Sequence, residues 1–150
     1  MVRLSPDPID PAALHAEFIR GRSDTGAVVT FTGLVRRDGD VEALELEAYE
    51  GFTESAIDDI LAEAMTRHGL DDALVVHRIG RVEPGEPVVF VAAAARHRRA
   101  AFEAVDQLMD YLKSRAPFWK KSHQADGARW IEPTDADRAD ANRWDLTETP

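Results

Sequence analysis

Cysteine is absent from this chain of 150 residues. Without cysteine there can be no disulfide bond, no thiolate nucleophile, no iron–sulfur cluster and no cysteine-ligated zinc. If the protein takes part in sulfur chemistry, the sulfur must therefore arrive on another molecule.

Long apolar runs are also missing. No stretch approaches the ~20 apolar residues that a membrane-spanning helix needs. Residues 1–18 lack an apolar signal core followed by a small-residue cleavage site. We therefore expect a cytoplasmic protein.

Basic residues are outnumbered by acidic ones, 18 against 28, so the formal net charge is −10. Nucleic acids and anionic membranes are both bound through basic faces, so we expect neither as a partner. Four of the histidines, His15, His68, His77 and His123, show no ligand spacing such as H-E-x-x-H. We interpret them as surface or core residues, and we expect no metal site and no cofactor.

The positive charge that is present gathers in one window. Residues 96–121 hold seven Lys and Arg residues against three acids, a balance of +4 in a chain that totals −10. The seven are Arg96, Arg98, Arg99, Lys113, Arg115, Lys120 and Lys121. An acidic protein that concentrates its cations in this way has a candidate site for an anionic ligand.

The composition, 44% hydrophobic and 31% charged, is typical of one compact globular domain. The apolar periodicity predicts strands over 26–35, 43–50, 73–80 and 87–95. It also predicts three helices, whose limits come from capping and breaking residues. They run over 11–19 with an Asp10 cap, from a Thr53 cap to Gly69, and over 97–115, ending before Pro117. We expect the first two strands to form a hairpin or its longer-looped equivalent.

This order of elements favours an α+β domain of two layers, with helices against a mostly antiparallel sheet. We assign residues 1–132 to the domain. Residues 133–150 are rich in Asp and poor in apolar side chains. We expect this tail to be flexible, or ordered only against a partner.

The predicted helix over 97–115 is amphipathic. At about 100° per residue, its apolar stripe faces the core and its opposite side is solvated. The stripe consists of Phe102, Val105, Met109 and Leu112, and the solvated side carries Gln107 and Arg115. Lys113 projects within about 20° of Phe102, and Arg98 within about 40°.

Two interpretations of these cations stay open on the residues alone. A partly desolvated Lys113 has a lowered pKa and acts as a base or nucleophile; alternatively it lays its stem on apolar surface and keeps its ammonium in water. Arg96, Arg98 and Arg99 at the helix start either bind a phosphate or form a solvated basic turn. Arg36 and Arg37, taken alone, are typical of a hairpin turn.

Four segments together resemble the large, catalytic subunits of molybdopterin synthase, the MoaE-like family. They are GAVVTFTGLVR (26–36), LELEAYEGFTESA (44–56), the run from HRIGRVEPGE to APFWKK (77–121) and DGARWIE (126–132). The most specific part is MDYLKSRAPFWKK (109–121).

The resemblance implies an α/β hammerhead-type fold with an additional small antiparallel sheet. It implies a sulfurtransferase of molybdenum cofactor biosynthesis, which converts precursor Z, a cyclic pyranopterin monophosphate, into molybdopterin by installing a dithiolene. Both sulfurs come from the C-terminal Gly-Gly thiocarboxylate of a small ubiquitin-like carrier subunit. Two large subunits form a central homodimer with a carrier at each end, a heterotetramer.

The resemblance also assigns site residues. The catalytic lysines are Lys113 and Lys120. The substrate-binding residues are Arg36, His97, Arg98, Lys121, Phe31 and Met109. Some of them enter the site from the neighbouring subunit in this family, and His97 is a candidate for that role here.

The sequence departs from the family at two points. Leu34 stands where a lysine is frequent, and the extra Arg96 and Arg99 either join the phosphate field or lie on the surface. Two other functions remain open: a binding module for an anionic nucleotide or pterin, and an inactive scaffold that only holds the carrier. Both keep a basic pocket, but neither needs two lysines flanking Pro-Phe-Trp.

Overall fold

The computed structural model describes residues 1–145 of the chain. Its body is a four-stranded sheet with the strand order β1-β4-β6-β2. Strand β1 runs parallel to β4, and the other neighbours are antiparallel. The strands span Val2–Ser5 (β1), Asp72–Arg78 (β4), Pro87–Ala95 (β6) and Ala27–Leu34 (β2).

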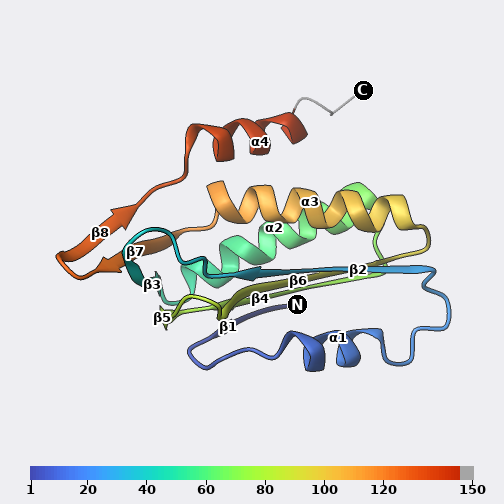
Figure 1. The fold of residues 1–150 in the computed structure, drawn as a ribbon. Coiled ribbons are helices and arrows are strands. Elements are labelled where there is room, and N and C mark those ends of the chain that lie inside the picture. The colour runs from blue at the N-terminus through green and yellow to red at the C-terminus, as the bar shows by residue number, and fades with distance from the viewer. Residues whose placement is uncertain (146–150) are drawn as a thin grey trace.

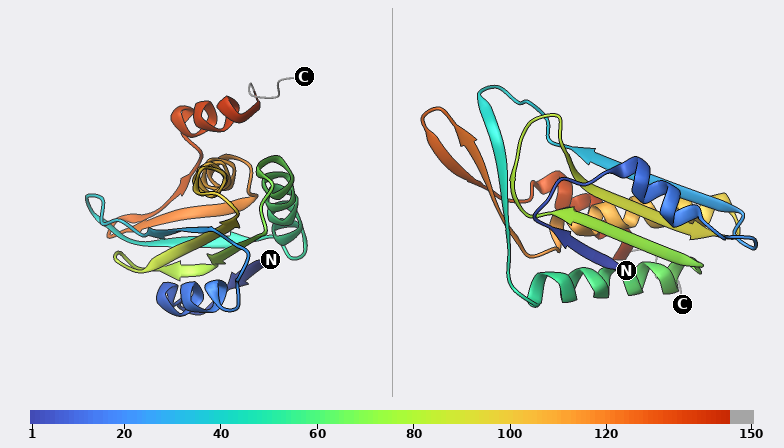
Figure 2. Two further views of the ribbon diagram at one scale, coloured as in Figure 1. Left: turned by 90° about the vertical axis from the view of Figure 1, so that its right-hand side faces the viewer. Right: turned by 90° about the horizontal axis from the view of Figure 1, so that it is seen from below.

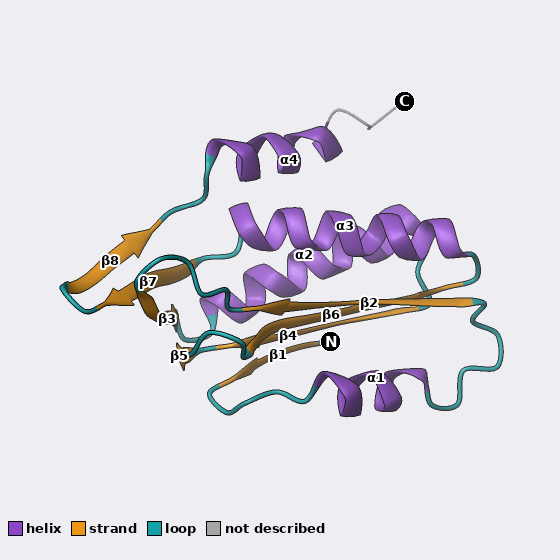
Figure 3. Ribbon diagram, in the orientation of Figure 1, coloured by secondary structure: helices purple, strands orange, loops and turns teal. Residues whose placement is uncertain are grey.

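A second sheet, with the order β5-β3-β7-β8, stands at one end of the first (Figure 3). All its neighbouring strands are antiparallel. The strands span Gly80–Val82 (β5), Val41–Ala48 (β3), Phe118–Gln124 (β7) and Gly127–Ile131 (β8). The predicted α+β class, with a mostly antiparallel sheet and an additional antiparallel sheet, is confirmed.

Helices cover both faces of the first sheet (Figures 1 and 2). Helix α1 (Pro11–Ile19) lies on one face, while α2 (Phe52–His68) and α3 (Arg98–Ser114) lie side by side on the other. Helix α4 (Asp135–Asp145) packs against α3 on the side away from the sheet. Within the described residues, no helix is both long and apolar enough to cross a membrane.

The two central strands are apolar on both sides because helices cover both sides. Val75 and Val91 pack into the core beneath α2 and α3. Leu74 and Phe90, on the opposite side of the same strands, pack with Phe18 of α1. The continuous apolar runs of β4 and β6 therefore contribute side chains to two cores, one on each face of the sheet. Alternate positions along each strand point toward α3.

The helix boundaries follow the predicted caps in two places. The Asp10 carboxylate accepts a hydrogen bond from the backbone N–H of Ala13 at 3.1 Å, which caps α1. Gly69 ends α2 with a φ of 62°, in the left-handed region that glycine adopts without strain. At the start of α2 the cap is Gly51, and Thr53 lies inside the helix.

The hairpin predicted for residues 26–50 does not form. Strand β2 pairs with β6 in the first sheet, and β3 pairs with β5 and β7 in the second. Leu46 of β3 is buried in a small separate core with Val35 and Val82. The apolar side of β3 is therefore buried at the end of the molecule, and the chain between β2 and β3 crosses from the first sheet to the second instead of forming a hairpin.

The buried side of α3 is broader than the predicted stripe. Val105 and Leu112 are buried as predicted, but Phe102 is 60% exposed. Gln107, predicted to be solvated, is fully buried and accepts a hydrogen bond from Nε2 of His68 at 2.6 Å. The reason is that α2 and α4 cover α3 in addition to the sheet, so burial extends around the helix.

Helix α4 is ordered within a segment that was predicted to be flexible. The Arg143 guanidinium pairs with Asp106 at 2.7 Å and with Asp110 at 2.8 Å. The indole N–H of Trp144 donates to Asp110 at 2.6 Å. These contacts lie within one chain, so the order of α4 needs no partner. Residues 146–150 of the predicted tail lie outside the described residues.

We predict that Arg143→Gln loosens α4 without unfolding the domain, because it removes both ion pairs to α3. Amide hydrogen exchange over residues 135–145, measured by mass spectrometry, should accelerate roughly five- to tenfold, while exchange in β4 and β6 stays unchanged. The matched control is Arg138→Gln, since Arg138 pairs with Asp135 inside α4 itself at 3.1 Å. Equal exchange in the two variants contradicts the assignment of Arg143 as the anchor.

Candidate active site

A cavity of about 620 Å³ lies where the two sheets meet the C-terminal end of α3. Its walls come from the end of β2 and the loop that follows, from β3 and β7 of the second sheet, from α3, and from the ends of β4 and β6 that approach the second sheet. A volume of this size is in the range of pockets that hold small-molecule ligands. The cavity is therefore the candidate site.

Lys120 reaches the cavity from β7. It lies opposite Leu46 of β3, and both side chains line the cavity. Burial lowers the pKa of Lys120, the nearby charge of Lys113 lowers it further, and the carboxylate of Asp137 partly opposes these effects. A lysine in this setting exchanges a proton more readily than one in water.

Lys113 reaches the same cavity from the last turn of α3. It shares one side of the helix with Met109 and Leu112, which lie four and one residues before it, and all three line the cavity. The helix must end soon afterwards, because Pro117 disfavours helical geometry at Ala116. The cavity thus receives one lysine from a helix and one from a strand. Lys113 is exposed, so its ammonium stays in contact with water, as the second interpretation of this lysine expects.

The turn between these two lysines is held by the buried hydroxyl of Thr53. This hydroxyl donates to the carbonyl oxygen of Pro117 at 2.8 Å and accepts from the backbone N–H of Tyr49 at 2.9 Å. One side chain of α2 therefore ties the end of β3 to the start of β7. Because Pro117 immediately precedes β7, this tie fixes where Lys120 enters the cavity.

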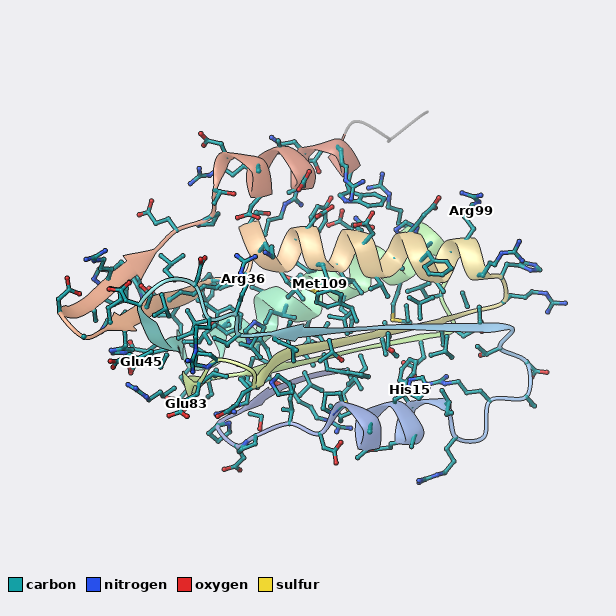
Figure 4. The ribbon with its side chains drawn as sticks, viewed as in Figure 1. His15, Arg36, Glu45, Glu83, Arg99 and Met109 are labelled. Carbon is teal, nitrogen blue, oxygen red and sulfur yellow. The ribbon has the colours of Figure 1, made fainter. Side chains whose placement is uncertain are left out.

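The end of β2 supplies Phe31 and Arg36 to the cavity. A register irregularity between Gly33 and Leu34 redirects the chain toward the rim. Gly33 is required there, since an added Cβ would lie 2.7 Å from Cγ1 of Val89. The Arg36 side chain is 85% exposed, and Figure 4 shows it on the same side of the sheet as Met109 of α3.

Three predicted substrate-binding residues do not join this cavity. His97 and Arg98 are exposed at the other end of α3, where Figure 4 shows Arg99 projecting. Lys121 follows Lys120 on β7 and so points to the opposite face, where its ammonium lies 4.4 Å from the ring centroid of Trp130. Lys121 was predicted to bind substrate, and β7, which was not recognised from the sequence as a strand, turns it away from the cavity that Lys120 lines.

Two groups near the lysines were not predicted to take part. His77, interpreted only as a surface or core histidine, is buried and also lines the cavity. Asp137 comes from α4, and the charges of Lys113 and Lys120 help to lower its pKa after the dominant effect of its hydrogen bond from the Thr134 backbone. The alternation of side chains along β4 could have shown that His77 points inward. No such pattern pointed to Asp137, because its segment was expected to be flexible.

Comparison with known proteins identifies the family. A family model described as "MoaE protein" matches residues 4–115. The chain belongs to the MoaE family. This membership confirms the resemblance found in the sequence.

Relatives of the MoaE family match nearly the full chain. A protein of Caulobacter vibrioides named molybdopterin synthase catalytic subunit is 59% identical over 97% of both chains. A solved MoaE protein of molybdopterin biosynthesis from Burkholderia ambifaria is 41% identical over 97% of both chains, with a TM-score of 0.83. A solved complex of subunits 1 and 2 of molybdopterin-converting factor from Helicobacter pylori has the same fold, with 19% identity, a TM-score of 0.74 and coverage of 89% of this chain and 90% of that one.

We predict that Lys120→Met raises the melting temperature at pH 7, because it removes an amine whose charge folding must desolvate. The pKa of Lys120 is lower in the folded than in the unfolded state, so the unfolded state binds more protons between the two values. The free-energy cost of burying the charged amine reduces the stability of the fold fully at pH values below the folded pKa. This cost fades as the pH rises toward the unfolded pKa of 10.5. The advantage of the variant should therefore shrink as the pH is raised.

Lys121→Met is the matched control for this measurement, since it removes the adjacent lysine from the opposite face of the same strand. Thermal unfolding of both variants and the wild type across pH 7 to 10 decides the outcome. A gain that is equal for the two variants, or that does not change with pH, contradicts the desolvation of Lys120.

Proposed function

We propose that this protein is the catalytic subunit of a molybdopterin synthase, which transfers sulfur from the C-terminal thiocarboxylate of a small carrier protein to precursor Z in the cytoplasm. One observation carries the proposal: a member of the MoaE family, with no cysteine, brings Lys113 and Lys120 from two different elements into one cavity. The family membership supplies the reaction, and the cavity supplies a place for it.

The chemistry required of the two lysines suits their environment. In each round a carbon–sulfur bond forms on the pterin side chain as a carbon–oxygen bond at the same carbon breaks, and the displaced oxygen leaves with a proton. Hydrolysis of the acyl–sulfur bond then leaves the sulfur on the pterin and an ordinary carboxylate on the carrier. Lys113 and Lys120 polarise the acyl group, stabilise the developing negative charge and move protons. Two rounds are needed for a dithiolene, so the half-thiolated intermediate stays bound while a spent carrier is exchanged.

The substrate phosphate has an anchor at the rim of the cavity. Arg36 is exposed there and pairs with Asp38 at 3.6 Å, an exposed ion pair that is weak enough to be exchanged for a phosphate. Phe31 and Met109 provide apolar wall for the pterin. Lys121, which faces away, has no part in this arrangement.

His97 and Arg98 act in the cavity of a neighbouring subunit under this proposal. Both are exposed at the end of α3 that is remote from their own cavity, so a homodimer is what brings them to a substrate. The small carrier with its Gly-Gly thiocarboxylate is the second partner. A protein of the same fold occurs in a two-subunit complex in Helicobacter pylori, in keeping with this assembly.

The proposal is tested by incubating the purified protein with thiocarboxylated carrier and precursor Z, and assaying molybdopterin as its fluorescent oxidation product. Lys113→Ala should reduce turnover at least ~100-fold, because it removes an acid–base group from the cavity. Lys121→Ala, on the outer face, is the matched control and should retain activity. Carrier binding and dimerisation should be unchanged in both.

The alternatives are separated by the same assay. A wild-type protein that folds and binds the carrier but forms no molybdopterin is a scaffold, and one that binds precursor Z without the carrier and forms no product is a binding module. Either result overturns the proposed enzyme. Unfolding of Lys113→Ala would show that this lysine serves the structure instead.

The sharing of sites between subunits has its own prediction. Lys113→Ala and His97→Ala should each be inactive, yet a re-assembled mixture should recover about a quarter of the wild-type activity, since half of the dimers are mixed and each holds one intact site. Dimers assembled from either variant alone are the control. No recovery in the mixture means that His97 and Lys113 do not act across the dimer.

A further inference from the structure

His77 is a buried imidazole in the wall of the cavity to which the proposed function gives no role. It lies near the end of β4 and is 7% exposed. Alternation along β4 places it on the same side as Ala73 and Val75, which face α2 and α3. A polar ring on this side, at the end nearer the second sheet, points into the cavity and not into solvent.

Two contacts fix the orientation of the His77 ring. Its Nδ1 lies 2.8 Å from the backbone carbonyl oxygen of Arg78. The ring also stacks on Phe118, with the centroids 4.3 Å apart and the planes inclined by 28°. The ring is therefore clamped between its own strand and β7, and it can neither flip nor swing without losing one of these contacts.

The hydrogen bond at Nδ1 decides the tautomer. A carbonyl oxygen only accepts, so Nδ1 carries the proton, and Nε2 of the neutral ring is an acceptor. Among residues 1–145, no group donates a hydrogen bond to Nε2. Burial, together with the charge of Lys120, lowers the pKa of His77 to about 4 despite its backbone hydrogen bond, so the ring is neutral near pH 7.

The other charged groups of the cavity have the opposite character. Lys113, Lys120 and Arg36 only donate hydrogen bonds. They suit a phosphate or a thiocarboxylate, which only accept. Of the two carboxylates nearby, Asp38 is 75% exposed at the rim, and Asp137 accepts a hydrogen bond from the backbone N–H of Thr134. A ligand group that must donate can therefore use Nε2 of His77, an acceptor that two contacts hold in a fixed orientation.

Phe118 places this acceptor beside the reactive lysine. Phe118 and Lys120 are two residues apart on β7, so they share a face with their Cα atoms about 7 Å apart. The His77 ring lies on Phe118 and therefore next to the stem of Lys120. A planar heterocycle whose reacting side chain lies at Lys120 has its ring edge within reach of His77.

We propose that His77 is a substrate-recognition residue, whose Nε2 accepts a hydrogen bond from an N–H group of the pterin ring of the bound substrate. This inference rests on the proposed function for the identity of the ligand. A heterocycle without a donor at that edge leaves a buried acceptor unpaired and is rejected. The cations select the anionic groups of the ligand, and His77 selects its ring.

The first experiment compares the binding of precursor Z to the wild type, His77→Phe and His77→Gln by calorimetry. Phenylalanine keeps a flat ring on Phe118 but has no acceptor, so the affinity should fall roughly tenfold or more. Glutamine restores an acceptor and should recover much of the loss. Inorganic phosphate, which probes only the cations, should bind all three proteins equally. His123→Gln, on the outer face of β7, is the matched control.

The second experiment reads the contact directly and needs no turnover. In protein with ¹⁵N-labelled histidine, the Nε2 resonance of His77 should move upfield when precursor Z binds, as an acceptor nitrogen does on gaining a hydrogen bond, and inorganic phosphate should not move it. An unmoved resonance with precursor Z bound overturns the proposal, even if a variant has failed to fold.

The outcomes also separate this inference from the proposed function. A shifted resonance without molybdopterin formation leaves the recognition role standing and overturns the enzyme. Turnover in the wild type with unchanged binding in His77→Phe overturns the recognition role alone. If precursor Z does not bind the wild type at all, both are overturned.

Discussion

The two-residue period of β7 is the constraint on which the site depends. The basic cluster at the end of α3 looks like one patch in the sequence, but the pleated strand divides it between two faces. Lys120 turns inward opposite Leu46, and Lys121 turns outward onto Trp130. Pro117 ends the helix at the point from which this division begins, and the Thr53 hydroxyl holds that point in place.

The division has an electrostatic consequence. An ammonium group inside a partly apolar cavity is unfavourable, and a second cation nearby makes it more so. The protein tolerates the pair because Lys113 stays exposed at the helix end and Asp137 of α4 offsets part of the charge. A helix that packs on the outside of α3 thereby contributes to the electrostatics of a cavity on its inner side.

Local patterns in the sequence were sufficient for the helices, the long strands and the position of Lys113, because caps, periodicity and Pro117 act over a few residues. They were insufficient wherever the outcome depends on distant pairing. Residues 118–124 pair with β3, whose register partners lie 70 (Ala48 and Phe118) to 83 (Val41 and Gln124) positions earlier. Neither β7 nor the outward turn of Lys121 was therefore foreseen. The burial of Gln107 likewise depends on packing between distant segments, because its hydrogen-bond partner is His68 of α2.

The absence of cysteine acquires a chemical meaning once the cavity is known. Under the proposed function a thiocarboxylate enters the cavity, and any thiol or disulfide of the protein would exchange with it there. The walls around Lys113 and Lys120 consist of carbon, nitrogen and oxygen groups, apart from the inert thioether of Met109. Under the proposed function, sulfur delivered there meets no cysteine with which to form a bond, so the substrate is its destination and the protein leaves each round chemically unchanged.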